Sequence, residues 1–183
     1  MAFETETARG RKASILEFFL TIFFAIVGLV YLTTAAYTRD MLWFWPLFNA
    51  QPSSALIRCY GKEIYLDGSS QELKTIAEIV NKQISGKKRW DELNLTDQTY
   101  ETYRTSPNVM ILELYYATPQ RIHSPSPFFS GFTELLIPLD GQYADTSIFF
   151  SLVDGKPSGS SFHVESFSAL TEYLSQSGLC TKK

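Results

Sequence analysis

The sequence predicts an α+β domain with a mainly antiparallel β-sheet and two to three helices, preceded by a single N-terminal transmembrane helix. Three observations support this prediction. A long apolar segment lies near the N-terminus. After it, segments typical of strands, a helix, more strands and a last helix follow one another, which favours the α+β class. Two cysteines and a formal net charge of -3 in 183 residues exclude a disulfide-dense mini-protein and argue against a basic nucleic-acid-binding protein.

The transmembrane helix is predicted over Ile15–Tyr37, in which Glu17 is the one charged residue. At a rise of ~1.5 Å per residue this segment spans about 35 Å, enough to cross a bilayer core that is ~30 Å thick. Apolar side chains cover every face of the helix, whereas a soluble helix would keep a polar stripe. Ser14 and Glu17 fit a capping box that would hold Glu17 at the lipid headgroups. The alternative is a buried carboxylate that pairs with another subunit.

The flanking charges predict the orientation of this helix. Arg9, Arg11 and Lys12 precede it, and Arg39 is the one basic residue that follows closely. The positive-inside rule then makes residues 1–14 a short cytoplasmic tail and places the bulk of the chain outside the cell membrane. A cleaved signal peptide is the alternative, but its apolar core is usually about 7–15 residues long. We expect an uncleaved, single-pass anchor.

Residues 38–54 are predicted to form an interfacial aromatic segment and linker. Trp43, Phe44 and Trp45 are typical of the aromatic belt at a membrane–water interface. Pro46 directly after them ends any helix. We therefore expect these three aromatic side chains at the outer surface of the membrane.

The extracytoplasmic α+β domain is predicted over residues 55–183. It begins with two short strands, Ala55–Tyr60 and Glu63–Leu66, which form a hairpin. A capping box that starts at Ser69 begins a helix, and Gly86 suits its C-terminal end. The apolar face of this helix consists of Leu73, Ile76, Ala77, Val80 and Ile84.

The second half of the domain is predicted to be mostly strand. Thr96 is expected to cap a short helix that ends near Arg104. A last helix is predicted to begin at Ser166 and to end before Gly178. All helices are expected on one face of the sheet, and Pro138 on an edge or outside the hydrogen-bonded ladder. The predicted strands are Val109–Tyr116, Phe132–Leu139, Thr146–Val153 and, after a turn over Ser158–Ser161, Phe162–Glu165.

Cys59 and Cys180 are a candidate disulfide. Outside the cell they would be in an oxidising space, where such bonds persist. The bond would join the first strand to the segment after the last helix, and would contribute up to ~4–5 kcal/mol in the chain-entropy model. The sequence alone does not give the distance between the two residues, so both states remain open.

No motif of catalysis or cofactor binding is present. The G-x-S-x-G and phosphate-loop patterns are missing, and neither His123 nor His163 has a further ligand at metal-binding spacing. An enzyme would require one of these histidines to meet a carboxylate or a cysteine in space. We predict a protein that is not an enzyme and that holds no cofactor and no metal ion.

Two surface candidates remain. Lys87–Trp90 is a basic cluster that could contact lipid headgroups or an acidic partner, but a solvated loop is the expectation. Phe128, Phe129 and Phe132 follow the rigid Ser124–Pro127 segment and form a candidate partner surface. The alternative is that these phenylalanines lie in the core of the domain.

These features predict a membrane-anchored, non-enzymatic interaction protein, an accessory or assembly subunit of a membrane protein complex. Its expected partners are the lipid bilayer and other membrane proteins, and not nucleic acid. The alternative is an extracytoplasmic ligand-binding or regulatory module that acts on a membrane partner such as a sensor kinase. The sequence identifies no small-molecule ligand.

Overall fold

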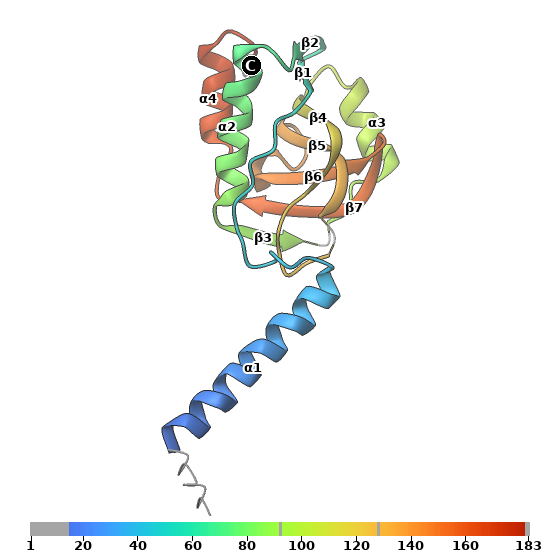
Figure 1. Ribbon diagram of the computed structural model, residues 1–183. Coiled ribbons are helices and arrows are strands. Elements are labelled where there is room, and N and C mark those ends of the chain that lie inside the picture. Colours follow the sequence, from blue (N-terminus) through green and yellow to red (C-terminus); the bar gives the residue numbers. More distant parts are fainter. Residues whose placement is uncertain (1–14, 92, 128, 182–183) are drawn as a thin grey trace, which may run out of the picture.

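The protein is described by a computed structural model that covers residues 15–91, 93–127 and 129–181. One long helix projects from a domain in which helices cover a β-sheet (Figure 1). The predicted tail over residues 1–14, with the capping residue Ser14, lies outside the described residues, as does Phe128.

Helix α1 (Ile15–Thr38) contains 24 residues and ends one residue beyond its predicted bound. It is long and apolar enough to cross a membrane, and it is the one such helix in the described part of the chain. Nearly all of its apolar side chains are exposed, which a water-soluble helix would avoid. The hydroxyls of Thr21 and Thr33 donate to carbonyl oxygens one turn earlier, at Glu17 and Leu29, so they need no water.

The domain contains one seven-stranded sheet in the order β2-β1-β4-β5-β6-β7-β3, and every neighbouring pair is antiparallel. Three further α-helices accompany the sheet, so the predicted α+β fold is confirmed. The strands are β1 (Ser54–Cys59), β2 (Lys62–Asp67), β3 (Lys88–Asp91), β4 (Met110–Arg121), β5 (Ser130–Asp140), β6 (Ile148–Val153) and β7 (Lys156–Val164). The helices are α2 (Gln71–Ser85), α3 (Asp97–Thr105), the 3-10 turn η1 (Ala144–Thr146) and α4 (Ser168–Gln176).

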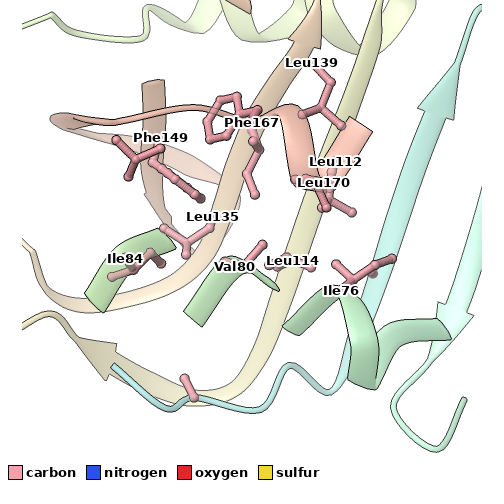
Figure 2. Packing of buried hydrophobic residues seen from close by; sticks show 14 of the residues in the cluster. Ile76, Val80, Ile84, Leu112, Leu114, Leu135, Leu139, Phe149, Phe167 and Leu170 are labelled. Carbon is pink, nitrogen blue, oxygen red and sulfur yellow. The ribbon is translucent and has the colours of Figure 1, made fainter. Parts of the chain in front are cut away.

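The sheet carries a hydrophobic core on each face. Helices α2 and α4 lie side by side on one face (Figure 1), where Figure 2 shows Ile76 and Val80 of α2 and Leu170 of α4 near Leu112 and Leu114 of β4. Helix α3 covers the other face through Tyr100 and Tyr103. The expectation that all helices share one face was therefore wrong, because alternate residues of β4 and β6 are apolar on both sides.

The helix ends show how well local chemistry predicts boundaries. The side chain of Thr96 accepts a hydrogen bond from the Thr99 N–H, as predicted for the cap of α3. Helix α2 is capped by Ser70, which accepts from the Leu73 N–H, and not by Ser69. Ser69 instead donates to the carboxylate of Asp67 in the preceding turn.

Two strand predictions were wrong. Strand β7 runs through the predicted turn over Ser158–Ser161, since the chain already reverses at Asp154–Gly155, where both residues have positive φ. The predicted loop after α2 is strand β3, which pairs with β7 at the edge of the sheet. The expectation that Pro138 lies on an edge or outside the ladder was also wrong, because Pro138 pairs with Ile111 of the neighbouring strand β4. On its other side the β5–β6 ladder pairs only residues 134–136 of β5.

Candidate functional site at the α1 end of the domain

The domain is fastened to the end of α1 by a group of polar residues, the Asp40 cluster (Thr38, Asp40, Arg121 and His123). The Asp40 carboxylate accepts hydrogen bonds from His123 Nδ1 at 2.8 Å and from the Leu42 N–H at 2.9 Å. The Arg121 guanidinium lies 3.8 Å from the same carboxylate and donates to the Thr38 carbonyl at 3.3 Å. Arg121 ends β4, so the cluster joins the last turn of α1 to a central strand.

Burial and charge act in opposite directions on Asp40, whose side chain is only 7% exposed. Burial raises the pKa of this carboxyl, whereas the hydrogen bonds from His123 and Leu42 and the charges of His123 and Arg121 lower it. The pKa of Asp40 falls below its ordinary value of 3.8 as the net result. Asp40 is therefore an anion at neutral pH, held by the Arg121 guanidinium and by hydrogen bonds from His123 and Leu42.

The three predicted interface residues lie just after α1. Phe44 and Trp45 are exposed, and Trp43 is half-buried against Phe44 at 5.9 Å between ring centroids. The Tyr31 ring of α1 lies 6.1 Å from the Phe44 ring, and its hydroxyl donates to the Met41 carbonyl. These contacts fold the aromatic segment back onto the last turns of α1. Its place at a membrane surface stays a prediction.

The linker then runs along the C-terminal half of α2. The Phe48 N–H donates to Ser85 Oγ at 2.9 Å, and Ser85 Oγ lies 3.3 Å from the Phe48 carbonyl. Further on, Asn81 donates to the Ala50 carbonyl. Phe48 and Ala50 are buried in the core, so the linker is part of the domain and not a flexible tether.

An open depression of about 370 Å³ lies beside this point, between β3 and the end of β7. Three consecutive cationic residues contribute to it, here named the basic edge (Lys87, Lys88 and Arg89). The expectation of a solvated loop was wrong for Lys88 and Arg89, because β3 holds both in register with β7. The depression is lined by Lys87, Lys88, Arg89, Thr146, His163, Val164 and Glu165.

His163 lies in this depression with both ring nitrogens occupied. Nδ1 is 2.6 Å from the Thr146 carbonyl, and Nε2 is 2.7 Å from the Asp91 carboxylate. Both partner oxygens are hydrogen-bond acceptors for the imidazole ring. Its role here is to join β3, β7 and the η1 turn.

Each histidine thus meets a carboxylate, which was the condition set above for an enzyme. Oriented Asp–His pairs occur where a nucleophile is activated. Among the described residues, however, no serine, threonine or cysteine side chain is hydrogen-bonded to either imidazole. Nor does the described part of the chain group three or more potential metal ligands. The two pairs act in this structure as bonds between segments.

The candidate partner surface is buried at two of its three positions, Phe129 and Phe132. Phe129 and Phe132 are each 1% exposed, and both belong to the larger core. The Phe129 ring lies 5.0 Å from Trp90 and 4.8 Å from Phe162, so it completes an aromatic group under β3 and β7. The proposal of a partner surface at these two residues was wrong, because both side chains point into the core at the start of β5.

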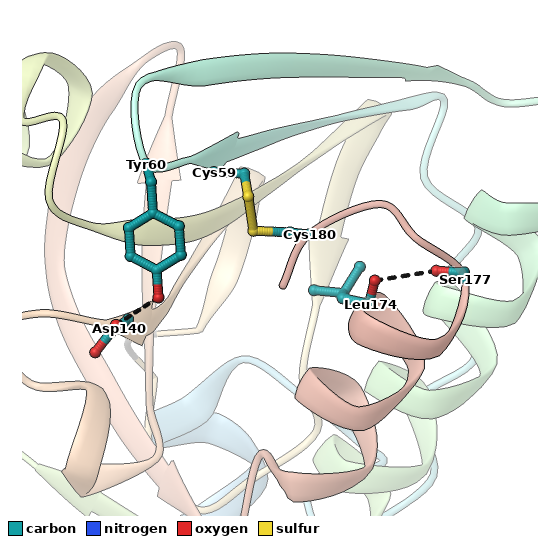
Figure 3. Close-up of a disulfide and its surroundings, with 6 residues drawn as sticks. All are labelled: Cys59, Tyr60, Asp140, Leu174, Ser177 and Cys180. Carbon is teal, nitrogen blue, oxygen red and sulfur yellow. Dashed lines mark hydrogen bonds between the residues drawn. A yellow bond between two sulfur atoms is a disulfide. The ribbon is translucent and has the colours of Figure 1, made fainter. Parts of the chain in front are cut away.

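A disulfide lies at the far end of the domain, opposite α1 (Figures 1 and 3). It joins Cys59 at the end of β1 to Cys180 after α4, with Cα atoms 5.7 Å apart, and no cysteine is free. Figure 3 also shows the Tyr60 hydroxyl donating to Asp140 at the end of β5. The disulfide holds the C-terminal segment at the end of β1, and the Tyr60 hydrogen bond joins the β1–β2 turn to the end of β5.

A second ionic group is buried beneath α3. Glu113 of β4 lies 3.6 Å from the Arg58 guanidinium and accepts a hydrogen bond from Tyr115 at 2.9 Å. Burial, and next the charge of Glu113, raise the pKa of Tyr100 to about 12. Burial raises the pKa of Glu134. The hydrogen bond from the Gly155 N–H acts against this shift, and the charge of Glu113 adds to it. The side chains of Arg58 and Glu113 are largely buried, and we interpret the two as a structural ion pair.

The fold and the site together define an α+β domain fixed to the end of a helix that is able to cross a membrane. Comparisons with protein-family models, with characterised proteins and with solved structures give no match for this chain. Any function is therefore argued from the geometry above.

Proposed function

We propose that this protein is a single-pass, membrane-anchored, non-enzymatic interaction protein that serves as an accessory or assembly subunit of a membrane protein complex. Its N-terminus would lie in the cytoplasm and its domain outside the cell membrane. The observation that carries this proposal is the Asp40 cluster, which bonds the domain directly to the last turn of α1.

A fixed joint matters because a simple anchor does not need one. A flexible polar linker is enough to keep a soluble domain near a membrane. Here the buried Asp40 carboxylate is bonded to Arg121 and His123, and the linker packs into the core. Together these contacts set the direction in which the domain leaves the helix. A subunit that binds neighbours through its helix would thereby present its domain to them in one orientation. We interpret the joint as a device for assembly.

Purification of the full-length chain in mild detergent, followed by mass spectrometry of bound proteins, tests this proposal. We expect other membrane proteins in stoichiometric amounts. Asp40→Ala should reduce their recovery, whereas Asp67→Asn, which changes an exposed carboxylate on β2, should not. A chain that purifies alone from crosslinked membranes would contradict an accessory subunit and favour the ligand-binding or regulatory module. Extraction by alkaline carbonate would contradict the anchor itself.

A further inference from the structure

We infer that the basic edge (Lys87, Lys88 and Arg89) is a binding surface for the phosphate headgroups of anionic phospholipids. This inference rests on the proposed membrane anchoring, and it adds a lipid class and a site to it. The surface is the open depression of about 370 Å³ between β3 and the end of β7.

The position of the basic edge is the first argument. In Figure 1, β3 is the strand at the α1 end of the domain, and the C-terminal end of α2 points the same way. The Phe48–Ser85 hydrogen bond gives the same placement independently. Phe48 follows the aromatic residue Trp45 by three positions, and Lys87 follows Ser85 by two. The basic edge therefore lies next to the point where the chain would leave a bilayer.

The second argument is that two of the three cations are available. The Lys87 side chain is 91% exposed, and the carboxylate nearest to it, that of Glu165, is 3.8 Å away and itself exposed. Arg89 is exposed beside His163, its partner in the β3–β7 pair. Lys88 differs, because its ammonium donates to the Ile84 and Gly86 carbonyls at the end of α2. Lys87 and Arg89 are thus the residues that would contact a headgroup.

The chemistry of these groups points to a phosphate. Ammonium and guanidinium groups donate hydrogen bonds and accept none, which matches an oxyanion. The whole chain carries a formal net charge of -3, so the positive charge of three adjacent cations is confined to this edge and is not shared by the protein as a whole. Asp91 and Glu165 offset part of this charge, but Asp91 is bonded to His163. Each basic residue at an anionic surface strengthens binding about fivefold.

Native mass spectrometry of the full-length protein in neutral detergent tests the inference, with phosphatidylglycerol and phosphatidylcholine titrated separately. We expect tighter binding of phosphatidylglycerol, weakened by high salt. Lys87→Gln combined with Arg89→Gln should reduce its affinity about fivefold to twenty-five-fold. The matched control is Lys62→Gln combined with Lys74→Gln, which removes two exposed lysines on β2 and on the first turn of α2, and should change little.

Three outcomes would overturn the inference. These are equal affinity for the two lipids, an equal loss in the control variant, or displacement of the lipid by inorganic phosphate at the same concentration, which would assign a site for the free anion. Carbonate extraction of the same preparation separates the two proposals. A chain that resists extraction but shows no lipid preference is anchored without a headgroup site.

Discussion

The two ends of the domain are closed by different chemistry. At the far end, the Cys59–Cys180 disulfide ties the C-terminal segment to β1. At the α1 end, the Asp40 cluster joins helix and domain through hydrogen bonds and charge. A covalent bond responds to redox conditions but hardly to pH or salt, whereas a buried ionic group responds to protonation and to the loss of any one partner. The far end is therefore closed by a bond that pH and salt hardly affect. The α1 end is closed by an ionic group that fixes the orientation of the domain on the helix.

Removal of the disulfide should have the largest effect on stability. Cys59 and Cys180 are separated by 121 residues, and the chain-entropy model gives a loss of about 4–5 kcal/mol for a loop of that size. We expect the Cys59→Ala, Cys180→Ala variant to unfold at a much lower urea concentration than the wild type. Tryptophan fluorescence of the full chain in detergent monitors the unfolding. A loss below about 1 kcal/mol would show that the far end is held by packing alone.

The same cysteines test the orientation of the chain. In the oxidised protein no cysteine is free. A membrane-permeant thiol reagent added to cells should therefore not label the protein before reduction. Labelling without reduction would contradict the proposed extracytoplasmic domain, because thiols stay reduced in the cytoplasm.

Asp40→Ala should have the second largest effect. The substitution leaves the Arg121 guanidinium and the His123 ring without their carboxylate partner, at a cost of about 2 kcal/mol. Amide hydrogen exchange should rise in residues 39–48 and at the end of β4, and remain unchanged around Cys180. An increase spread evenly over the domain would mean that the two ends do not unfold separately.

The sequence predicted what depends on local patterns. A long apolar run was enough for α1, the Thr96 cap for the start of α3, and the helical period for the apolar face of α2. Strand β3 was missed because its four residues alternate weakly and carry three charges; its place is decided by pairing with β7, about 70 residues later. Phe129 and Phe132 were ambiguous for a similar reason, since an aromatic run beside prolines is equally compatible with a surface and a core.

The Asp40 cluster was beyond sequence reasoning. Asp40 and His123 lie 83 positions apart, and no spacing rule joins them. The available signal was an aspartate placed directly after an apolar helix, where a charge needs a partner. Neither the identity of that partner nor its distance follows from composition, because β4 brings Arg121 and His123 to this point only when the sheet forms.

Acid should loosen the α1 end before the far end. The pKa of Asp40 is lowered in the folded protein, so its contribution is complete above the unfolded value of 3.8 and is lost as pH falls through the lower folded value. The free energy of unfolding should therefore drop more steeply below about pH 4 in the wild type than in Asp40→Asn. Asp67→Asn is the comparison at an exposed position: hydrogen bonds from Ser69 also lower the pKa of Asp67, so acid removes its contribution too, but solvent makes that contribution smaller. Equal effects of Asp40→Asn and Asp67→Asn would remove this distinction between the ends.

The smallest effect is expected at the basic edge, where stability and binding should separate. Lys87 and Glu165 form an exposed ion pair, and such pairs contribute about 0–1 kcal/mol, so Lys87→Gln should change the free energy of unfolding by less than about 0.5 kcal/mol. Lys88→Gln should cost more, about 1 kcal/mol, because the Lys88 ammonium donates to two carbonyls at the end of α2. Urea titrations of both variants give this order directly. If Lys87→Gln were the more damaging change, the exposed cation would be needed for folding, and a loss of lipid binding in that variant would no longer report on the headgroup.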